Sequence, residues 1–177
     1  MQRVPVTLPA WIVGDGAEPA PAIGDAVSYR VVFSPANPHD LTEMCVQQQA
    51  VAETSARTAD GRYDVLLRFP TFTAASLAAQ PADGEVAVTG RLFVDYEIFG
   101  SGPQGRLTGT VIDRRVIVEE ALLPADPKAL RQPYPITFEL HPIPDGPFRF
   151  SMSPTPELGA VLRTQAGLLL TIDIPDA

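Results

Sequence analysis

The stretch VAVTGRLFVDYEI, residues 86–98, decides the fold because apolar and polar side chains alternate along it. Successive side chains of a β-strand point to opposite faces, so a period of two indicates a strand with one buried and one polar face. The apolar face holds Val86, Val88, Leu92, Val94, Tyr96 and Ile98, and the other face holds Thr89, Arg91, Asp95 and Glu97. The segment is therefore expected to be a half-buried antiparallel strand.

The same alternation recurs elsewhere along the chain, in residues 27–33, 63–69, 136–141 and 168–174. Such repetition predicts an all-β protein with one to three short helices, built as an antiparallel barrel or sandwich. A chain of 177 residues is typical of a single domain, here residues 1–177. Glycine and an acidic residue precede two of the strands, so duplicated half-barrels divided near residue 81 are the alternative.

Turn residues and breaks in the alternation indicate where the expected strands end or change face. Asp60-Gly61 predicts a tight hairpin turn, because these residues tolerate positive φ angles. From Leu107 to Val118 the alternation slips, which predicts either a bulge near Asp113 or a strand buried on both faces. The glycine-rich residues 100–105 are expected to form the tip of a long hairpin whose flanking strands pair with each other.

Helices are expected to be short. Asn37 and Pro38 fit the N-cap and first position of a helix, and we expect one or two helical turns followed by a strand leading to Asp60-Gly61, although residues 43–57 also fit a helix loosely. Thr73–Gln80 is rich in alanine and is expected to be helical. A third helix is predicted to begin at Thr155 and to include Val161 and Leu162.

Composition and charge exclude several classes of protein. The formal net charge is −8 and Lys128 is the only lysine, so the chain lacks the basic footprint of a nucleic-acid-binding protein. Arg114 and Arg115 are adjacent and should point to opposite faces of a strand. The N-terminus MQRVPVTLPAWIV lacks the pattern of a signal peptide, and no apolar run approaches the ~20 residues that span a bilayer. We therefore expect a cytoplasmic protein without a membrane partner.

Part of the sequence resembles an uncharacterised actinobacterial domain family. The similarity lies in Trp11 and Gly14 followed by PAIGDAVSY (residues 21–29), and in LTGTVI (residues 107–112), which looks like a later strand of that family. It covers about a fifth of the chain, and its residues are common in turns and strands. Since the family has no assigned activity, the resemblance implies no mechanism.

Motifs for catalysis or cofactor binding are weak. Cys45, the only cysteine, could act with His39 or His141, but its surroundings match no nucleophile motif. Glu139 and His141 share a strand face, yet two histidines are too few for a histidine-rich metal site, so we expect no metal. The glycine-rich loop lacks the Lys and Ser/Thr of a phosphate-binding loop, so we expect no nucleotide cofactor.

The most informative surface lies on the polar face of residues 86–98. Phe93 and Phe99 flank Asp95 and Glu97 there, and exposed aromatic residues beside charges are typical of a contact surface. Cover by a helix such as Thr73–Gln80, or by another sheet, is the competing interpretation. These residues predict a non-enzymatic module that binds a protein partner or self-associates. The alternative is a small hydrolase or ligand-processing barrel that uses the carboxylates of Asp95, Glu97 or Glu139.

Overall fold

The computed structural model describes residues 1–14, 16, 19–95, 104–126, 136–143, 148–150 and 159–176. Strands make up 64% of the structure and helices 6%, which confirms the all-β prediction. The elements in chain order are β1 (Gln2–Pro9), α1 (Ala10–Gly14), β2 (Ala26–Pro35), the 3₁₀-helix η1 (Thr42–Met44), β3 (Cys45–Arg57), β4 (Tyr63–Arg68), β5 (Thr73–Ala78), β6 (Gly84–Val94), β7 (Arg106–Leu122), β8 (Ile136–Pro142) and β9 (Val161–Ile174).

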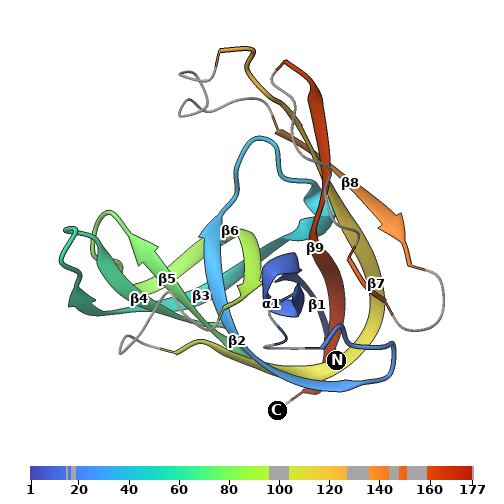
Figure 1. The fold of residues 1–177 in the computed structure, drawn as a ribbon. Coiled ribbons are helices and arrows are strands. Elements are labelled where there is room, and N and C mark those ends of the chain that lie inside the picture. The colour runs from blue at the N-terminus through green and yellow to red at the C-terminus, as the bar shows by residue number, and fades with distance from the viewer. Residues whose placement is uncertain are drawn as a thin grey trace.

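Within the described chain, the strands form one nine-stranded sheet in the order β2-β5-β4-β3-β6-β1-β9-β7-β8. Pairing of β2 with β7 closes eight of them into a ring, and β8 lies beside β7 outside that ring. A further pairing of β2 with β6 crosses the ring and divides it into two lobes, one with β3, β4 and β5 and the other with β1, β7 and β9 (Figure 1). The ladders are antiparallel except for single parallel bridges between β1 and β6 and between β2 and β5.

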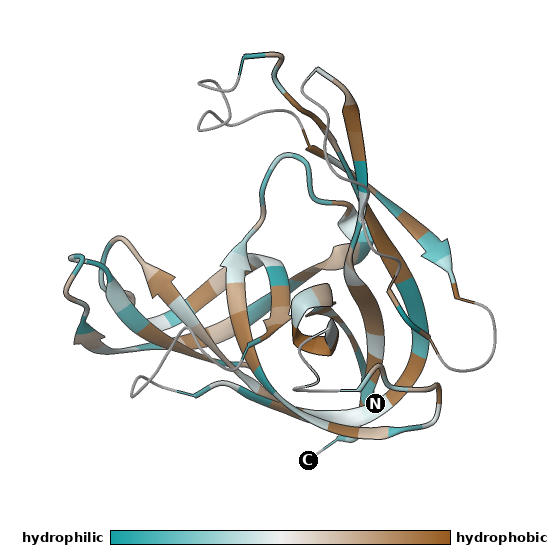
Figure 2. Ribbon diagram, in the orientation of Figure 1, coloured by the Kyte–Doolittle hydropathy of each residue, from teal (hydrophilic) through white to brown (hydrophobic). Residues whose placement is uncertain are grey.

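The core follows the predicted alternation. Figure 2 shows apolar and polar residues alternating along the strands. In β2 the odd positions Tyr29, Val31 and Phe33 are buried, and in β6 Leu92 and Val94 are almost fully buried. The strands predicted in residues 27–33, 63–69, 136–141 and 168–174 all correspond to observed strands. The strand predicted for residues 86–98 is confirmed through Val94, and its last residues, 96–98, lie outside the described part of the chain.

The predicted irregularity of β7 is also confirmed. The register between β7 and β9 shifts between Val111 and Asp113, so one residue of β7 has no partner across the ladder. This bulge moves the buried positions of β7 from Leu107, Gly109 and Val111 to Arg114 and Val116. The loss of alternation in the sequence thus records a real change of face.

The predicted pairing of the strands on either side of residues 100–105 is wrong. β2 pairs with β6 through Val31–Pro35 and with β7 through Ala26–Arg30, and both ladders are antiparallel. β6 and β7 therefore run in the same direction, one after the other along β2. The hairpin does not form because β6 and β7 each pair with β2 instead of with each other. Residues 96–103 lie outside the described chain.

The helix predicted for Thr73–Gln80 is wrong, and the one predicted to begin at Thr155 is wrong in its described end. Thr73–Ala78, the alanine-rich segment, is the strand β5, which pairs with β4 along its whole length. Val161 and Leu162 begin the strand β9 rather than continuing a helix, and residues 151–158 lie outside the described chain. In both cases pairing with neighbouring strands overrides local helix propensity.

The segment from Asn37 to Arg57 is largely as predicted. A single 3₁₀ turn, η1, leads into the strand β3. Asn37 is not its N-cap, because the residue before the turn is Leu41. Asn37 and Asp40 instead form a separate turn, in which the Asn37 N–H donates to Asp40 Oδ2 at 2.8 Å and the Asp40 N–H donates to the Asn37 carbonyl at 3.0 Å.

The helix α1 follows β1 directly and lies within the outline of the second lobe (Figure 1). Ile12 of this helix is fully buried, whereas Trp11 is 46% exposed. Among the residues that the structure describes, no helix has both the length and the apolar character needed to cross a membrane.

Candidate functional site

A cleft of about 720 Å³ opens where the two lobes meet. Parts of β1, α1, β2, β5 and β6 line it, together with the turn that joins β3 to β4. The lining residues are Pro9, Trp11, Val32, Phe33, Ser34, Pro35, Arg62, Leu77, Phe93, Val94 and Asp95. Small-molecule sites in proteins commonly have volumes of ~300–1,000 Å³ and mainly apolar walls with a few polar groups. The cleft meets both criteria.

The strand registers explain why distant residues meet in this cleft. Val32 of β2 is opposite Phe93 of β6 on one side and opposite Ala75 of β5 on the other. Residues opposite each other in a sheet share a face, and so do residues two apart in one strand. Leu77 therefore lies on the same face as Val32 and Phe93. The crossing of the ring by the β2–β6 ladder brings these three side chains together.

The two charged residues of the lining differ in accessibility. The side chain of Arg62 is 53% exposed, whereas Asp95 is only 7% exposed. Asp95 follows β6 directly, and its N–H donates to the carbonyl of Arg30 at 3.1 Å. Asp95 also lines a small neighbouring cavity of about 10 Å³, shared with Arg30, Gln104 and Gly105. Among the described residues of the lining, the accessible charge is therefore the guanidinium of Arg62.

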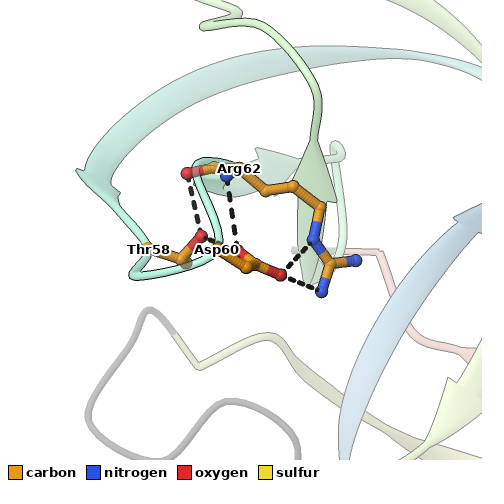
Figure 3. Close-up of polar contacts among 3 residues, drawn as sticks. All are labelled: Thr58, Asp60 and Arg62. Atoms are coloured by element: carbon orange, nitrogen blue, oxygen red, sulfur yellow. Dashed lines mark hydrogen bonds and ion pairs between the residues drawn. The ribbon is translucent and has the colours of Figure 1, made fainter.

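The turn between β3 and β4 holds Arg62 in place (Figure 3). Asp60 Oδ2 accepts hydrogen bonds from Nε of Arg62 at 2.8 Å and lies 2.7 Å from Nη2. Thr58 closes the turn, because its N–H and its hydroxyl both donate to the Arg62 carbonyl, at 2.8 and 2.9 Å. The Thr58 hydroxyl also contacts Asp60 Oδ1. Hydrogen bonds from Thr58 and Arg62 lower the pKa of Asp60 from 3.8 to about 2, so its carboxylate stays ionised to a lower pH than that of an ordinary aspartate.

Of the four predicted binding residues, Phe93 and Asp95 both line the cleft, while Glu97 and Phe99 lie outside the described chain. The sequence-based reasoning missed Trp11 and Arg62. Trp11, which lies in α1, carried little signal, because its exposure is known only from the structure. Arg62 carried none, because a residue after a tight turn can point in any direction until the neighbouring strands are placed.

A second cluster lies on the same face of β6, centred on Arg91. Its Nη1 donates to Asp40 Oδ1 at 3.0 Å and its Nη2 donates to Thr7 Oγ1 at 3.3 Å. The guanidinium lies over the rings of Phe93 and Phe138, 4.5 and 5.2 Å from their centroids. Chain segments from the Asp40 turn and from β8 thus cover part of the polar face of β6. Cover by Thr73–Gln80 as a helix, considered from the sequence, is wrong, because that segment is β5.

Cys45 lies opposite Arg91 in the β3–β6 ladder. Burial and the neighbouring carboxylate of Asp40 raise the pKa of its thiol, and Arg91 partly opposes them. Within the described residues Cys45 makes no hydrogen bond to His39 or His141, so the thiol–histidine pair considered from the sequence is not assembled there. A raised pKa disfavours the thiolate that a nucleophile requires.

The carboxylate of Glu139 belongs to an exposed ionic cluster on β7, β8 and β9. Its Oε2 lies 3.0 Å from Nε2 of His141 and also accepts from Arg163, which in turn contacts Glu120 at 3.4 Å. The hydrogen bond from His141, with the charge of Arg163, lowers the pKa of Glu139. Glu139 is not part of the cleft lining, so Asp95 and Glu139 do not form a facing pair there. The described residues include no group of three or more metal-ligating side chains.

The arginines on β7 are dispersed. Arg114 is buried and donates from Nη1 to the carbonyl of Pro21 at 3.0 Å, whereas Arg115 is near Asp113 at 3.3 Å. The two therefore lie in different environments, as expected of adjacent residues in a strand.

Comparison with protein-family models, with curated proteins and with solved structures finds no match for this chain.

Proposed function

We propose that this chain is a non-enzymatic binding module that holds a small organic ligand in the cleft between its two lobes. The observation that carries the proposal is the cleft itself, with apolar walls from both lobes and two charged residues. Two of the residues chosen from the sequence, Phe93 and Asp95, contribute to these walls. A catalytic function is less well supported, because the carboxylates of Asp95 and Glu139 belong to different parts of the molecule.

The apolar walls set the main energetic term of binding. Each methylene group of a ligand that leaves water contributes ~0.8 kcal/mol, which corresponds to about fourfold in affinity. Loss of translational and rotational freedom offsets part of the total, so short ligands bind weakly. Affinity should therefore increase about fourfold per methylene in a homologous series until the cleft is full.

Trp11 provides a direct measurement. It is the only tryptophan in the chain and it lines the cleft, so its fluorescence reports on this site. Titration with primary alcohols from butanol to octanol should give saturable fluorescence changes with increasing affinity. A change that is linear in concentration, or affinities independent of chain length, would contradict the proposal.

A pair of variants tests the location of the site. Leu77 and Leu66 are both half-buried leucines on neighbouring strands and share one face of the sheet, but only Leu77 lines the cleft. Leu77→Gln should weaken octanol binding about tenfold or more, because the amide places polar atoms in an apolar wall. Leu66→Gln should leave binding unchanged. Thermal unfolding of both variants separates loss of binding from loss of fold.

A further inference from the structure

The chemistry of the cleft also indicates the polar group of its ligand, and this inference rests on the proposed function. Arg62 and Asp95 are the charged residues of the lining within the described part of the chain. Asp95 is 7% exposed and its backbone is fixed to Arg30, so a ligand in the cleft meets little of its carboxylate. The side chain of Arg62 is 53% exposed and is open to an incoming group. Of the charges that the structure describes there, the one that a ligand can reach is positive.

The guanidinium of Arg62 is only partly used by its intramolecular ion pair. Both of its contacts with Asp60 go to the single oxygen Oδ2, through Nε and Nη2. The remaining nitrogen, Nη1, points away from Asp60 (Figure 3). A guanidinium carries five N–H donors in a planar fork, so Nη1 and the outer N–H of Nη2 can still bind a second carboxylate.

The turn prepares Arg62 for this contact before any ligand arrives. Thr58 and Asp60 fix both the backbone and the side chain of Arg62. A side chain that is already ordered loses less conformational entropy on binding than a free one. Asp60 is ionised at neutral pH, as an ordinary aspartate is, and its lowered pKa extends this arrangement to more acidic pH.

We propose that the ligand is an amphipathic organic acid, whose carboxylate binds Nη1 and Nη2 of Arg62. Its apolar part then lies against the walls formed by Trp11, Leu77 and Phe93. The carboxylate contributes selectivity, and the apolar part contributes most of the affinity.

The test compares three ligands with the same octyl chain and different polar groups: nonanoate, octanol and octyltrimethylammonium. Binding is followed by the fluorescence of Trp11. At low ionic strength nonanoate should bind about three- to tenfold more tightly than octanol, in the range expected of a half-exposed charged contact. Octyltrimethylammonium should bind more weakly than octanol. Increasing ionic strength should remove the preference for nonanoate without weakening octanol binding.

Arg68 provides a matched control for Arg62. Both side chains are 53% exposed and both form an ion pair, Arg68 with Glu53 at 2.8 Å, but Arg68 does not line the cleft. Arg62→Gln should reduce nonanoate binding to the level of octanol, whereas Arg68→Gln should preserve the preference. The salt dependence of the unaltered protein gives a second measurement that does not depend on how a variant folds.

The outcomes separate this inference from the proposed function. Equal binding of the three ligands, tighter binding of the ammonium compound, or a nonanoate preference that survives Arg62→Gln would overturn the inference and leave the cleft as a binding site. If none of the three ligands binds, the proposed function is overturned together with the inference.

Discussion

The ion pair between Arg91 and Asp40 leads to a prediction that can be worked out in detail. Its side chains are 10% and 5% exposed, and Nη1 of Arg91 lies 3.0 Å from Oδ1 of Asp40. At this distance the Coulomb energy of two unit charges is ~5 kcal/mol for an effective dielectric constant of about 20. Removing one partner of a buried pair typically costs ~3–5 kcal/mol, because the other charge is left in a poorly solvated place.

Asp40→Asn is the appropriate change, since the amide oxygen can still accept the N–H of Asn37 and keep the turn. Arg91 would keep its contacts with the rings of Phe93 and Phe138. It would lose its only charged partner among the described residues, and its Nε already has no hydrogen-bond partner there. We expect the free energy of unfolding to fall by about 3 kcal/mol.

The assay is equilibrium unfolding in urea, and Glu53→Gln is the matched control. Glu53 pairs with Arg68 at 2.8 Å, but both side chains are more than half exposed, so this change should cost less than ~1 kcal/mol. Asp40→Asn should lower the midpoint while leaving the slope unchanged. Equal costs for the two variants would refute the reasoning that burial makes the Arg91 pair important.

Three further results are expected. Gly105→Ala should cost at least ~2 kcal/mol, because a Cβ there would lie 2.3 Å from a backbone oxygen, whereas Gly14→Ala meets no atom within 4 Å and should be neutral; equal melting temperatures would contradict this. Cys45 should react with iodoacetamide at pH 8 more slowly than a free cysteine, because burial raises the pKa of its thiol; an equal rate would count against it. The pKa of Asp60 is lowered from 3.8 to about 2, so its carboxylate should stabilise the folded turn above this pH range and lose that contribution as the pH falls through it. A titration midpoint of Asp60 near 4, measured by NMR, would contradict this.

The clearest failure of the sequence-based analysis concerns β5. Thr73–Ala78 is rich in alanine, the best helix former, and lacks alternation because Ala74, Ala75 and Ser76 are all buried. Gly105, just before β7, approaches the backbone of Ala74 and Ala75 so closely that a Cβ on Gly105 would lie about 2.4–2.5 Å from it. The segment thus packs as a buried strand, although its composition suggested a helix.

In the candidate site too, some residues could be identified from the sequence and others only from the structure. Phe93 and Asp95 could be chosen from the sequence because aromatic residues lie beside charged ones on the polar face of an otherwise regular strand. Arg62 and Trp11 could not be connected to them, because their proximity depends on the turn between β3 and β4 and on the position of α1. A local sequence pattern can show that one face of a strand is unusual, but it cannot show which other parts of the chain that face will contact.

The sequence by itself determined that this chain is built of strands, where most of them lie and where β7 changes face, because alternation is a local property of neighbouring residues. Tertiary structure alone decided that β2 pairs with β5, β6 and β7, that the ring is divided into two lobes and that a cleft opens between them. These features depend on pairings between residues far apart in the chain, and the hydrogen-bonding edges of a strand carry no record in its side chains of the partner they will meet.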